Sequence, residues 1–235
     1  MEQFARTKML IGEKGLALLQ QSKVIVFGVG GVGSFTVEAL ARAGIGYLVL
    51  VDFDTIDVTN INRQLPALHS TIGQYKVDLL QKRIMEVNPQ AQVDIYKEKV
   101  DAENVKTFLE GNPSYLVDAI DIISAKVALI VTAQQMGIPI VSAMGAGNRL
   151  DPSKLKIGDL SETAGCGCAL ARIMRRELKR KGIIKGVQVV YSVEQPQKNT
   201  DISLSRIPGS ISFVPSVAGL FLAAEVINNI LGNFR

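Results

Sequence analysis

The fold is decided by residues 23–52, which read KVIVFGVGGVGSFTVEALARAGIGYLVLVD. This stretch predicts a buried strand over 23–27, a glycine loop, a helix over 32–42 and a second buried strand over 47–51. Glycines let a backbone approach a phosphate closely, and the helix that follows presents free N–H groups to it. Asp52, at the end of the second strand, is placed to accept hydrogen bonds from ribose hydroxyls. The order predicts a nucleotide site but does not separate a dinucleotide from ATP.

The rest of the chain continues the alternation of strands and helices. We expect further helices over 7–20, 75–87, 102–109, 124–136 and 216–231, and strands over 92–96, 115–120, 139–143 and 187–192. Strands rich in Val, Ile and Leu that alternate with helices are typical of a parallel sheet covered on both faces. The sequence therefore predicts an α/β fold with a Rossmann-like, mostly parallel sheet and helices on both faces.

Composition narrows the function classes. The chain is 47% hydrophobic and 20% charged, which allows one sizeable core. The most apolar stretch, 213–224, is too short for a bilayer and predicts a buried helix, so we expect no membrane association. No secretory signal is recognised at the N-terminus, and Cys166 and Cys168 are too few for a disulfide framework or a closed zinc site. A reducing cytoplasm is the compartment that we expect.

Charged residues beyond Asp52 favour ATP over a nicotinamide dinucleotide. A hydride-transfer enzyme needs no cluster of cations there, whereas a triphosphate does. Arg63 can hold the terminal phosphates, and Lys76, in the first turn of a helix, can meet the α-phosphate where a new bond forms. Asp118 and Asp121, at the end of a later strand, have the position and charge to hold Mg²⁺. ATP and Mg²⁺ are therefore the expected cofactors, and a dehydrogenase is a distant alternative.

Five short motifs carry a family resemblance: GVGGVG, VDFD, TNINRQ, GQYK and DAID, in this order. In them the chain resembles the ubiquitin-activating-type superfamily, which includes the adenylating enzymes of sulfur-carrier proteins. The resemblance implies three catalytic residues, Arg63, Lys76 and Asp121, the last directed at Mg²⁺. It also implies a homodimer in which Arg6 reaches the nucleotide of the partner subunit. With the glycine loop, the candidate ATP contacts are Gly28, Gly30, Gly31, Gly33, Asp52, Asp54, Asn60, Arg63, Gln64, Lys76 and Asp118.

The second part of the chain suggests which carboxylate is activated. Basic residues clearly outnumber acidic ones after residue 150, and the whole chain has a net charge of +4. Helical spacing places five cations on one face, opposite Leu170, Ile173 and Leu178. These cations are Arg172, Arg175, Arg176, Lys179 and Arg180. These cations could simply form a solvent-exposed outer face of the helix. Alternatively, they could bind the phosphate backbone of a nucleic acid, which is the more specific hypothesis.

Longer segments are similar to the tRNA threonylcarbamoyladenosine dehydratases. They are RTKMLIGEKGLALLQQSKVIVFGVGGVGS (6–34), CALAR (168–172) and GSISFVPSVAGLFLAAEVI (209–227). The resemblance implies a tRNA substrate: ATP activates the threonyl carboxylate of a modified adenosine beside the anticodon, the side chain closes into a ring, and AMP leaves. The chain lacks the two Cys-x-x-Cys pairs that often hold zinc in sulfur-carrier activators. It departs from the dehydratases at Ala169, where a proline is expected.

The regular alternation of strands and helices ends after Asn148, which leads us to expect two parts. Residues 1–150 would form the ATP-binding adenylation core, and residues 151–235 would add the basic helix, a mobile loop over 194–209, additional strands and a final helix on the same domain. The first alternative function is adenylation of the C-terminal glycine of a ubiquitin-like sulfur-carrier protein. A second is a non-catalytic adaptor that retains ATP binding. A sulfur-transfer protein stays open as a further partner.

Overall fold

A seven-stranded sheet forms the centre of the computed structural model, which describes residues 2–197 and 208–232. The strand order is β3-β2-β1-β4-β5-β7-β6, and neighbours are parallel except for the antiparallel pair β6 and β7. The strands are β1 (Lys23–Phe27), β2 (Tyr47–Val51), β3 (Gln92–Tyr96), β4 (Tyr115–Asp118), β5 (Ile140–Ala143), β6 (Leu155–Asp159) and β7 (Gln188–Ser192). The mostly parallel α/β sheet expected from the sequence is confirmed.

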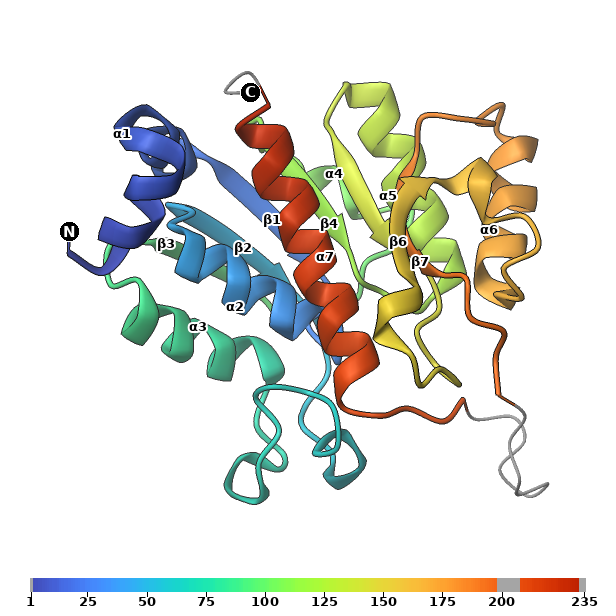
Figure 1. Cartoon of the computed structure of the whole chain (residues 1–235), viewed down its shortest axis with the longest axis horizontal. Coiled ribbons are helices and arrows are strands. Elements are labelled where there is room, and N and C mark those ends of the chain that lie inside the picture. The colour runs from blue at the N-terminus through green and yellow to red at the C-terminus, as the bar shows by residue number, and fades with distance from the viewer. Residues whose placement is uncertain (1, 198–207, 233–235) are drawn as a thin grey trace.

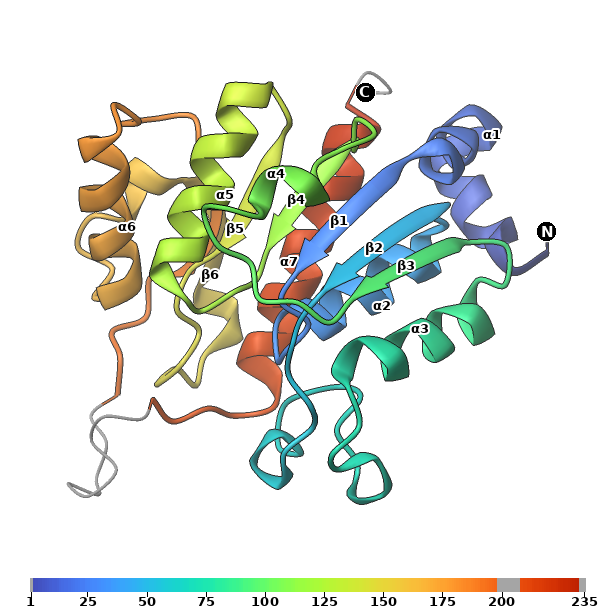
Figure 2. The ribbon, with the colours of Figure 1, turned by 180° about the vertical axis from the view of Figure 1, so that it is seen from behind.

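Helices cover both faces of this sheet (Figures 1 and 2). They are α1 (Ala5–Gln21), α2 (Gly33–Ala43), α3 (Lys76–Val87), α4 (Val105–Phe108), α5 (Ile123–Met136), α6 (Ala169–Arg180) and α7 (Phe213–Ile230). Alternate residues of β1 point to opposite faces, as the pleat of a strand requires. Val24 and Val26 pack with residues of α1, α2, α3 and α7, whereas Ile25 and Phe27 pack with α4, α5 and α6. The molecule therefore has two cores, one on each side of the sheet.

The C-terminal part continues the same sheet. Strand β7 pairs in parallel with β5, so the last two strands in the order come from residues after 150. Helix α7 returns across the sheet and packs closely on α2, where Thr36 Oγ1 donates to the Gly219 carbonyl at 3.0 Å. The division into two parts at residue 150 stays a prediction, because the sheet and the core cross it. Residues 198–207 of the loop expected over 194–209 lie outside the described residues.

Two expectations about elements were wrong. The helix expected over 102–109 is only the short α4, because side chains bond the backbone before it: the Asp101 carboxylate accepts from Glu103 N at 2.8 Å and the Asn104 amide oxygen accepts from Asp101 N at 2.9 Å. Strand β6 was not placed in advance because it has no apolar run. It is an edge strand: Leu155 is buried, whereas Lys156 and Ile157, which point to opposite faces of the sheet, are both exposed.

Helix α7 is the one helix among the described residues that is long and apolar enough to cross a membrane, by length and composition only. Val214, Leu222 and Val226 are fully buried in the core on one face of the sheet. Packing within the protein explains these buried residues, but Phe213 and Leu220 are 41% and 46% exposed, so α7 is only partly the buried helix expected from the sequence.

Candidate active site

A cleft of about 900 Å³ opens at the carboxyl ends of β1, β2, β4 and β5. This is the edge at which open α/β sheets bind ligands. One half of the cleft is lined by the glycine loop, by residues 51–64 and Lys76, and by the turns after β3 and β4. The other half is lined by residues 143–149, 167–170, 196 and 208–210. The cleft lies within the size range of small-molecule sites, so it has room for a nucleotide and part of a substrate.

The glycine loop forms the floor of the first half. Gly28 N donates to the Val51 carbonyl at 2.9 Å, which ties the loop to β2. Gly28, Gly30 and Gly31 line the cleft, but Gly33 does not. A Cβ atom at position 33 would lie 1.9 Å from the Gly28 carbonyl oxygen, so only glycine allows α2 to start this close to the loop. Gly33 therefore shapes the loop, whereas the other three present their backbone to the cleft.

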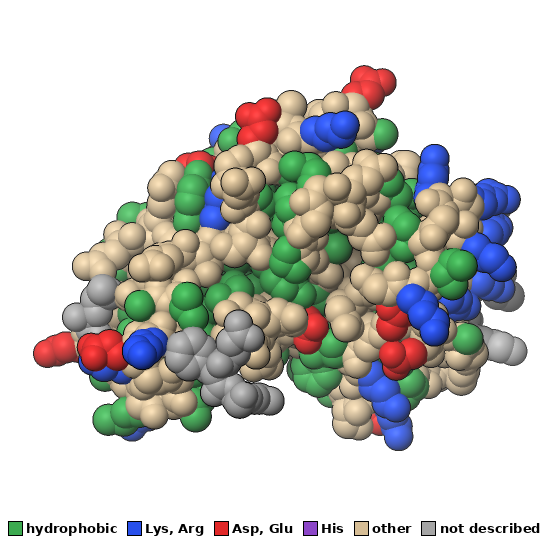
Figure 3. Space-filling view, turned by 90° about the horizontal axis from the view of Figure 1, so that it is seen from above, with side chains coloured by type: hydrophobic (Ala, Val, Ile, Leu, Met, Phe, Trp, Pro, Cys, Tyr) green, Lys and Arg blue, Asp and Glu red, His purple; other side chains and the backbone are tan. Residues whose placement is uncertain are grey.

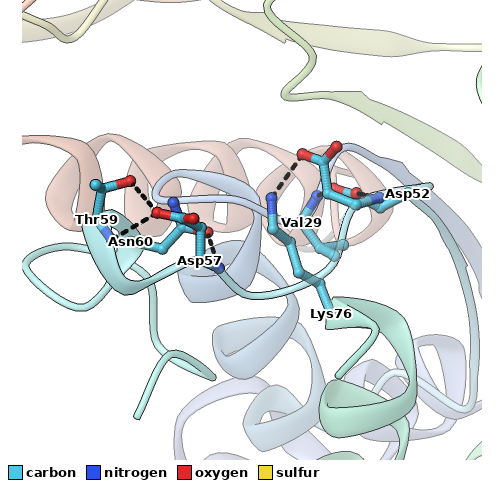
Figure 4. A network of polar contacts seen from close by, with 7 residues as sticks. Val29, Asp52, Asp57, Thr59, Asn60 and Lys76 are labelled. Atoms are coloured by element: carbon cyan, nitrogen blue, oxygen red, sulfur yellow. Dashed lines mark hydrogen bonds and ion pairs between the residues drawn. The ribbon is translucent and has the colours of Figure 1, made fainter. Parts of the chain in front are cut away.

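Asp52 follows β2 and lies at the wall of the cleft (Figure 4). Its side chain is buried, and it accepts hydrogen bonds from Val29 N at 2.7 Å and from Asp54 N at 2.8 Å. Burial raises the pKa of Asp52, although these hydrogen bonds and the charge of Lys76 oppose that shift. The carboxylate thus braces the glycine loop at the wall of the cleft.

Lys76 opens α3 and contributes a buried cation to the same wall. It is only 4% exposed, and its Nζ atom lies 2.7 Å from Oδ2 of Asp54. Asp54 is itself exposed at the cleft. Because the only ion-pair partner of Lys76 in the described part of the chain is a solvated carboxylate, a phosphate can compete for the ammonium group.

The loop after β2 brings Asn60, Arg63 and Gln64 to the cleft. The Asn60 side chain accepts from Asp57 N, and Asp57 in turn caps the short helix by accepting from Thr59 N at 2.8 Å (Figure 4). Half-buried Arg63 donates from Nη1 to the Thr59 carbonyl and to the Asn62 side chain, both at 2.8 Å. These bonds fix the loop and direct its polar side chains to one side.

Gln64 and Arg149 hold the two buried side-chain atoms that lack a hydrogen-bond partner in the described part of the chain. The atoms are Gln64 Oε1 and Arg149 Nε, and both residues line the cleft. Buried polar atoms are seldom left unpaired, because each costs about 1–3 kcal/mol. Because both unpaired atoms belong to residues that line the same cleft, we expect a polar ligand in the cleft to form hydrogen bonds with them.

The two aspartates after β4 lie in different places. Asp121 is exposed and lines the cleft. Asp118 is fully buried below it, where it accepts from Ser142 Oγ at 2.6 Å and pairs with Lys126 Nζ at 2.9 Å. This position argues against the contact with ATP or Mg²⁺ that the sequence suggested for Asp118. The side chain instead supports the turn that carries Asp121.

Arg6 lies away from the cleft of its own chain. It is an exposed residue in the first turn of α1, a helix that includes a non-helical residue at Gly12. Met9 and Leu10, on the same part of α1, are each 86% exposed. A contact between Arg6 and a nucleotide therefore requires a second subunit.

The basic face of α6 is only partly free. Arg172 and Lys179 are exposed, and Figure 3 shows Lys and Arg side chains gathered at the side of the molecule where α6 lies. Arg176 and Arg180 are also exposed, but both pair with Glu177. Arg175 is half-buried and donates to Thr163 Oγ1.

The buried side of α6 differs from the expected one. It consists of Ala171, Met174 and Leu178, not of Leu170, Ile173 and Leu178. The packed stripe is therefore rotated by about one position, which brings Arg175 to its border. This rotation explains why Arg175 anchors the helix to Thr163 instead of extending the outer basic face.

Comparison with known proteins agrees with this geometry. The family model described as "ThiF family" matches residues 4–234. The chain belongs to the ThiF family. A tRNA threonylcarbamoyladenosine dehydratase of Bacillus subtilis (strain 168) is 42% identical over 98% of this chain and 95% of its own length.

Solved structures of a ThiF-family relative cover almost the whole chain. The E. coli tRNA N6-threonylcarbamoyladenosine dehydratase in complex with AMP matches with a TM-score of 0.92 at 33% identity, over 99% of this chain and 95% of that one. The same enzyme in complex with ATP matches with a TM-score of 0.91, at the same identity and coverage. The similarity thus extends through both halves of the cleft.

Arg149, which lines the cleft, was not predicted from the sequence, and neither were the two buried residues that support the cleft from below. These two residues are Lys126 and Ser142, which hold Asp118. Arg149 could have been predicted from the sequence, because the segment MGAGNR directly follows β5. The carboxyl ends of parallel strands meet at the edge of the sheet that binds ligands. No local pattern marks Lys126, since only the packed structure shows that its ammonium group is buried.

Proposed function

We propose that this protein is an ATP-dependent tRNA threonylcarbamoyladenosine dehydratase. The observation that carries the proposal is a cleft with the polar residues for ATP, in a chain that matches a dehydratase solved with ATP over nearly its full length. The similarity to the Bacillus subtilis dehydratase is also near full length, which favours this function over activation of a carrier protein.

The reaction needs two steps. An oxygen of the threonyl carboxylate attacks the α-phosphorus of ATP, and pyrophosphate leaves. A nucleophile of the threonylcarbamoyl group then attacks the activated carbonyl carbon and loses its proton, and AMP leaves with the former carboxylate oxygen. The nucleoside has then lost one water. Because the attacking group belongs to the substrate, the enzyme needs no nucleophile of its own, and its task is to position and to stabilise charge.

Three side chains supply that stabilisation. Arg63 holds the terminal phosphates, and Lys76 leaves Asp54 to meet the α-phosphate, where negative charge develops during both steps. Asp52 accepts the ribose hydroxyls. The backbone of Gly28, Gly30 and Gly31 faces the phosphates.

Asp121 is the residue proposed to hold Mg²⁺. No group of three or more His, Cys, Asp or Glu side chains that could hold a metal occurs among the described residues. This fits Mg²⁺, which is usually bound by one or two carboxylates together with the phosphates of its nucleotide. When bound, the ion neutralises charge on the leaving pyrophosphate.

The proposed assembly is a homodimer in which Arg6 completes the partner's site. The exposed Met9 and Leu10 beside Arg6 support this proposal, since large apolar side chains at 86% exposure are suited to an interface. Arg6 then adds a cation to the phosphates of the partner's nucleotide.

The proposed tRNA face is the outer side of α6, led by Arg172 and Lys179 and extended by Arg176 and Arg180. Arg175 is left out of it because Thr163 holds its guanidinium.

The cytoplasm, where tRNA is modified, is the proposed compartment. A sulfur-transfer protein stays an open partner, with Cys168 as the cysteine that lines the cleft and Cys166 buried.

The direct test is mass spectrometry of tRNA nucleosides after incubation of tRNA with the protein, ATP and Mg²⁺. Loss of one water from threonylcarbamoyladenosine, with AMP and pyrophosphate formed in equal amounts, is the expected result. Pyrophosphate exchange that requires a ubiquitin-like carrier and not tRNA would establish the alternative. If the protein binds ATP but forms no AMP with either tRNA or the carrier protein, the result would support the non-catalytic adaptor.

A further inference from the structure

The two halves of the cleft differ sharply in charge. The half nearest the glycine loop carries eight charged lining residues: Asp52, Asp54, Asp57, Arg63, Lys76, Glu98, Lys99 and Asp121. In the other half, which we call the second half, Arg149 is the one charged lining residue in the described part of the chain. The remainder are small, apolar or weakly polar. Phosphates require charged partners, whereas a nucleobase has apolar faces and no charge.

The second half is built from four segments held together by their backbones. Asn148 is central to it: its N–H donates to the Gly209 carbonyl at 2.8 Å, its side chain accepts from Gly209 N at 2.6 Å, and its carbonyl accepts from Gln197 N at 2.8 Å. Asn148 has a φ of 57°, in the left-handed region, which is uncommon for a residue other than glycine. Asn adopts this region more readily than most residues, and the three hydrogen bonds fix Asn148 beside the cleft.

Close approach of the segments gives this half its walls. A Cβ atom at Gly147 would lie 2.9 Å from Cβ of Pro208, so the segment after β5 and the segment before α7 touch there. The start of α6 forms another wall, with Ala169 exposed and Leu170 half-buried, and it approaches the segment after β5 where a Cβ atom at Gly145 would lie 3.1 Å from Cys168 Sγ. The space between them is bordered by small and apolar side chains, which suits a planar group more than a polyanion.

Arg149 lies at the border of this space, and one of its donor atoms is unpaired. It is 3% exposed, and Nη2 donates to the Cys166 carbonyl at 3.3 Å, while Nε has no partner in the described part of the chain. The charge of Arg149 helps to lower the pKa of Glu194, but the two side chains form no ion pair in the described part of the chain, so the unpaired Nε can still bind an oxyanion from a ligand. The first turn of α6, Ala169 and Leu170, adds backbone amides that favour negative charge at the same place.

We propose that the second half of the cleft takes up the modified adenosine, splayed out of the tRNA loop, and that Arg149 pairs with an oxyanion of that nucleotide. The inference rests on the proposed function and adds the place and the residues that receive the substrate. A base must leave its stack to reach an enclosed site, and the exposed basic residues of α6 begin one turn beyond Ala169, where they can hold the flanking backbone. The oxyanion is either the threonyl carboxylate or an adjoining phosphodiester.

The first test fills the space with a larger side chain. Ala169→Phe places a ring in the second half, and Ala224→Phe is the matched control, because Ala224 is also an exposed helical alanine and does not line the cleft. With the full protein, tRNA and ATP, we expect Ala169→Phe to lower kcat/KM for tRNA by about 100-fold or more, since small displacements of a reacting group have effects of that size. Affinity for AMP should stay at the wild-type value in both variants.

The possible outcomes distinguish a wrong assignment of the adenosine site from a wrong assignment of the dehydratase function. Wild-type kcat/KM in Ala169→Phe would overturn the inference, and so would an equal loss of AMP affinity, which would assign this space to ATP. If the unaltered protein does not dehydrate threonylcarbamoyladenosine in tRNA at all, the proposed function fails first.

The second test identifies the oxyanion with Arg149→Gln, which removes the charge and keeps hydrogen-bond donors. Binding is measured to tRNA that carries the threonylcarbamoyl group and to the same tRNA made without it, with AMP affinity as the check on folding. Loss of the preference for modified tRNA assigns Arg149 to the carboxylate. An equal loss with both tRNAs assigns it to a phosphodiester, and no change with either tRNA overturns the role of Arg149.

Discussion

The Nζ atom of Lys126 lies 2.9 Å from Oδ2 of Asp118, and neither side chain is exposed to solvent. The same ammonium group donates to the Ile120 carbonyl at 3.0 Å, so it clamps the turn that follows β4. Two residues of that turn, Ile120 and Asp121, line the cleft. A buried ion pair often contributes little to net stability. We therefore infer that the pair of Lys126 and Asp118 serves mainly to hold this turn in position.

Breaking this pair should destabilise the protein and displace Asp121. Removing one partner of a buried ion pair leaves an uncompensated charge, so Lys126→Met should lower the free energy of unfolding by about 3–5 kcal/mol. The double variant Lys126→Met with Asp118→Asn should lose less than the sum of the single variants, because no lone charge remains. Urea unfolding measures the free energy of unfolding of the single and double variants. Additive losses would contradict a direct interaction between Lys126 and Asp118.

Substitution of the phosphate-binding cations should stop the chemistry. Arg63→Ala and Lys76→Ala should each lower kcat for dehydration by about 10²–10³, since each removes a charge that stabilises the transition state. Arg42→Ala is the matched control: it is a surface arginine paired with Glu38 and lies outside the cleft. The measurement is the rate of AMP formation with modified tRNA. Unchanged kcat in both cleft variants would remove these residues from the mechanism.

Affinity for AMP should fall on acidification because of Asp52. Burial raises the pKa of this carboxyl group, so it takes up a proton at a higher pH than an exposed aspartate does. The protonated form is a weaker acceptor for ribose hydroxyls. Calorimetric titration with AMP across the acidic range measures this loss, and Asp52→Asn should show lower affinity at neutral pH and no such dependence.

The same pKa shift affects stability in the opposite direction. Since the folded state binds this proton more tightly than the unfolded state, the contribution of Asp52 to stability is fully present below the unfolded pKa and is lost as pH rises through the folded pKa. Carboxyl groups whose pKa is lowered in the fold, such as Glu38 and Asp159, lose their stabilising contribution on acidification, so Tm should fall for reasons other than Asp52. Loss of AMP binding at a temperature well below Tm, seen in the wild type and not in Asp52→Asn, would assign the effect to Asp52.

Charges on the outer face of α6 should set the salt dependence of tRNA binding. The double variant Arg172→Ala with Lys179→Ala should weaken tRNA binding and reduce the slope of log K against log salt by about 1–2, since each phosphate contact contributes about 0.7–0.9. AMP affinity should not change. Lys82→Ala with Arg83→Ala, on α3, removes two cations elsewhere as a control. Equal slopes for the wild type and the α6 variant would contradict a tRNA face on α6.

Mixing two inactive variants should restore activity if Arg6 acts on the partner's site. Arg6→Ala and Lys76→Ala subunits each lack one component, and a mixed dimer contains one cleft with both Lys76 and an Arg6 from the other subunit. Co-refolded mixtures should therefore form AMP when the separate variants do not. No recovery in mixtures shown to contain mixed dimers would place Arg6 outside the reaction.

The sequence alone determined the fold class and much of the candidate nucleotide site. Residues 23–52 contain two short apolar runs separated by a glycine loop and a helical pattern, and the structure has each element within one residue of its expected bounds. Asp52, Arg63, Lys76 and Asp121 all line the cleft as expected. Such local patterns suffice because the carboxyl ends of parallel strands meet at one edge, whatever the details of packing.

Only the tertiary structure distinguished Asp118 from Asp121. The two aspartates are three residues apart and look equivalent in sequence, but Asp118 points into the packed interior and meets Lys126 from α5 and Ser142 from β5. The same applies to Arg149, whose burial depends on segments far away in the chain. Burial and partnership are properties of three-dimensional packing, so the sequence could name the charged residues at the site but could not assign which are supports and which face a ligand.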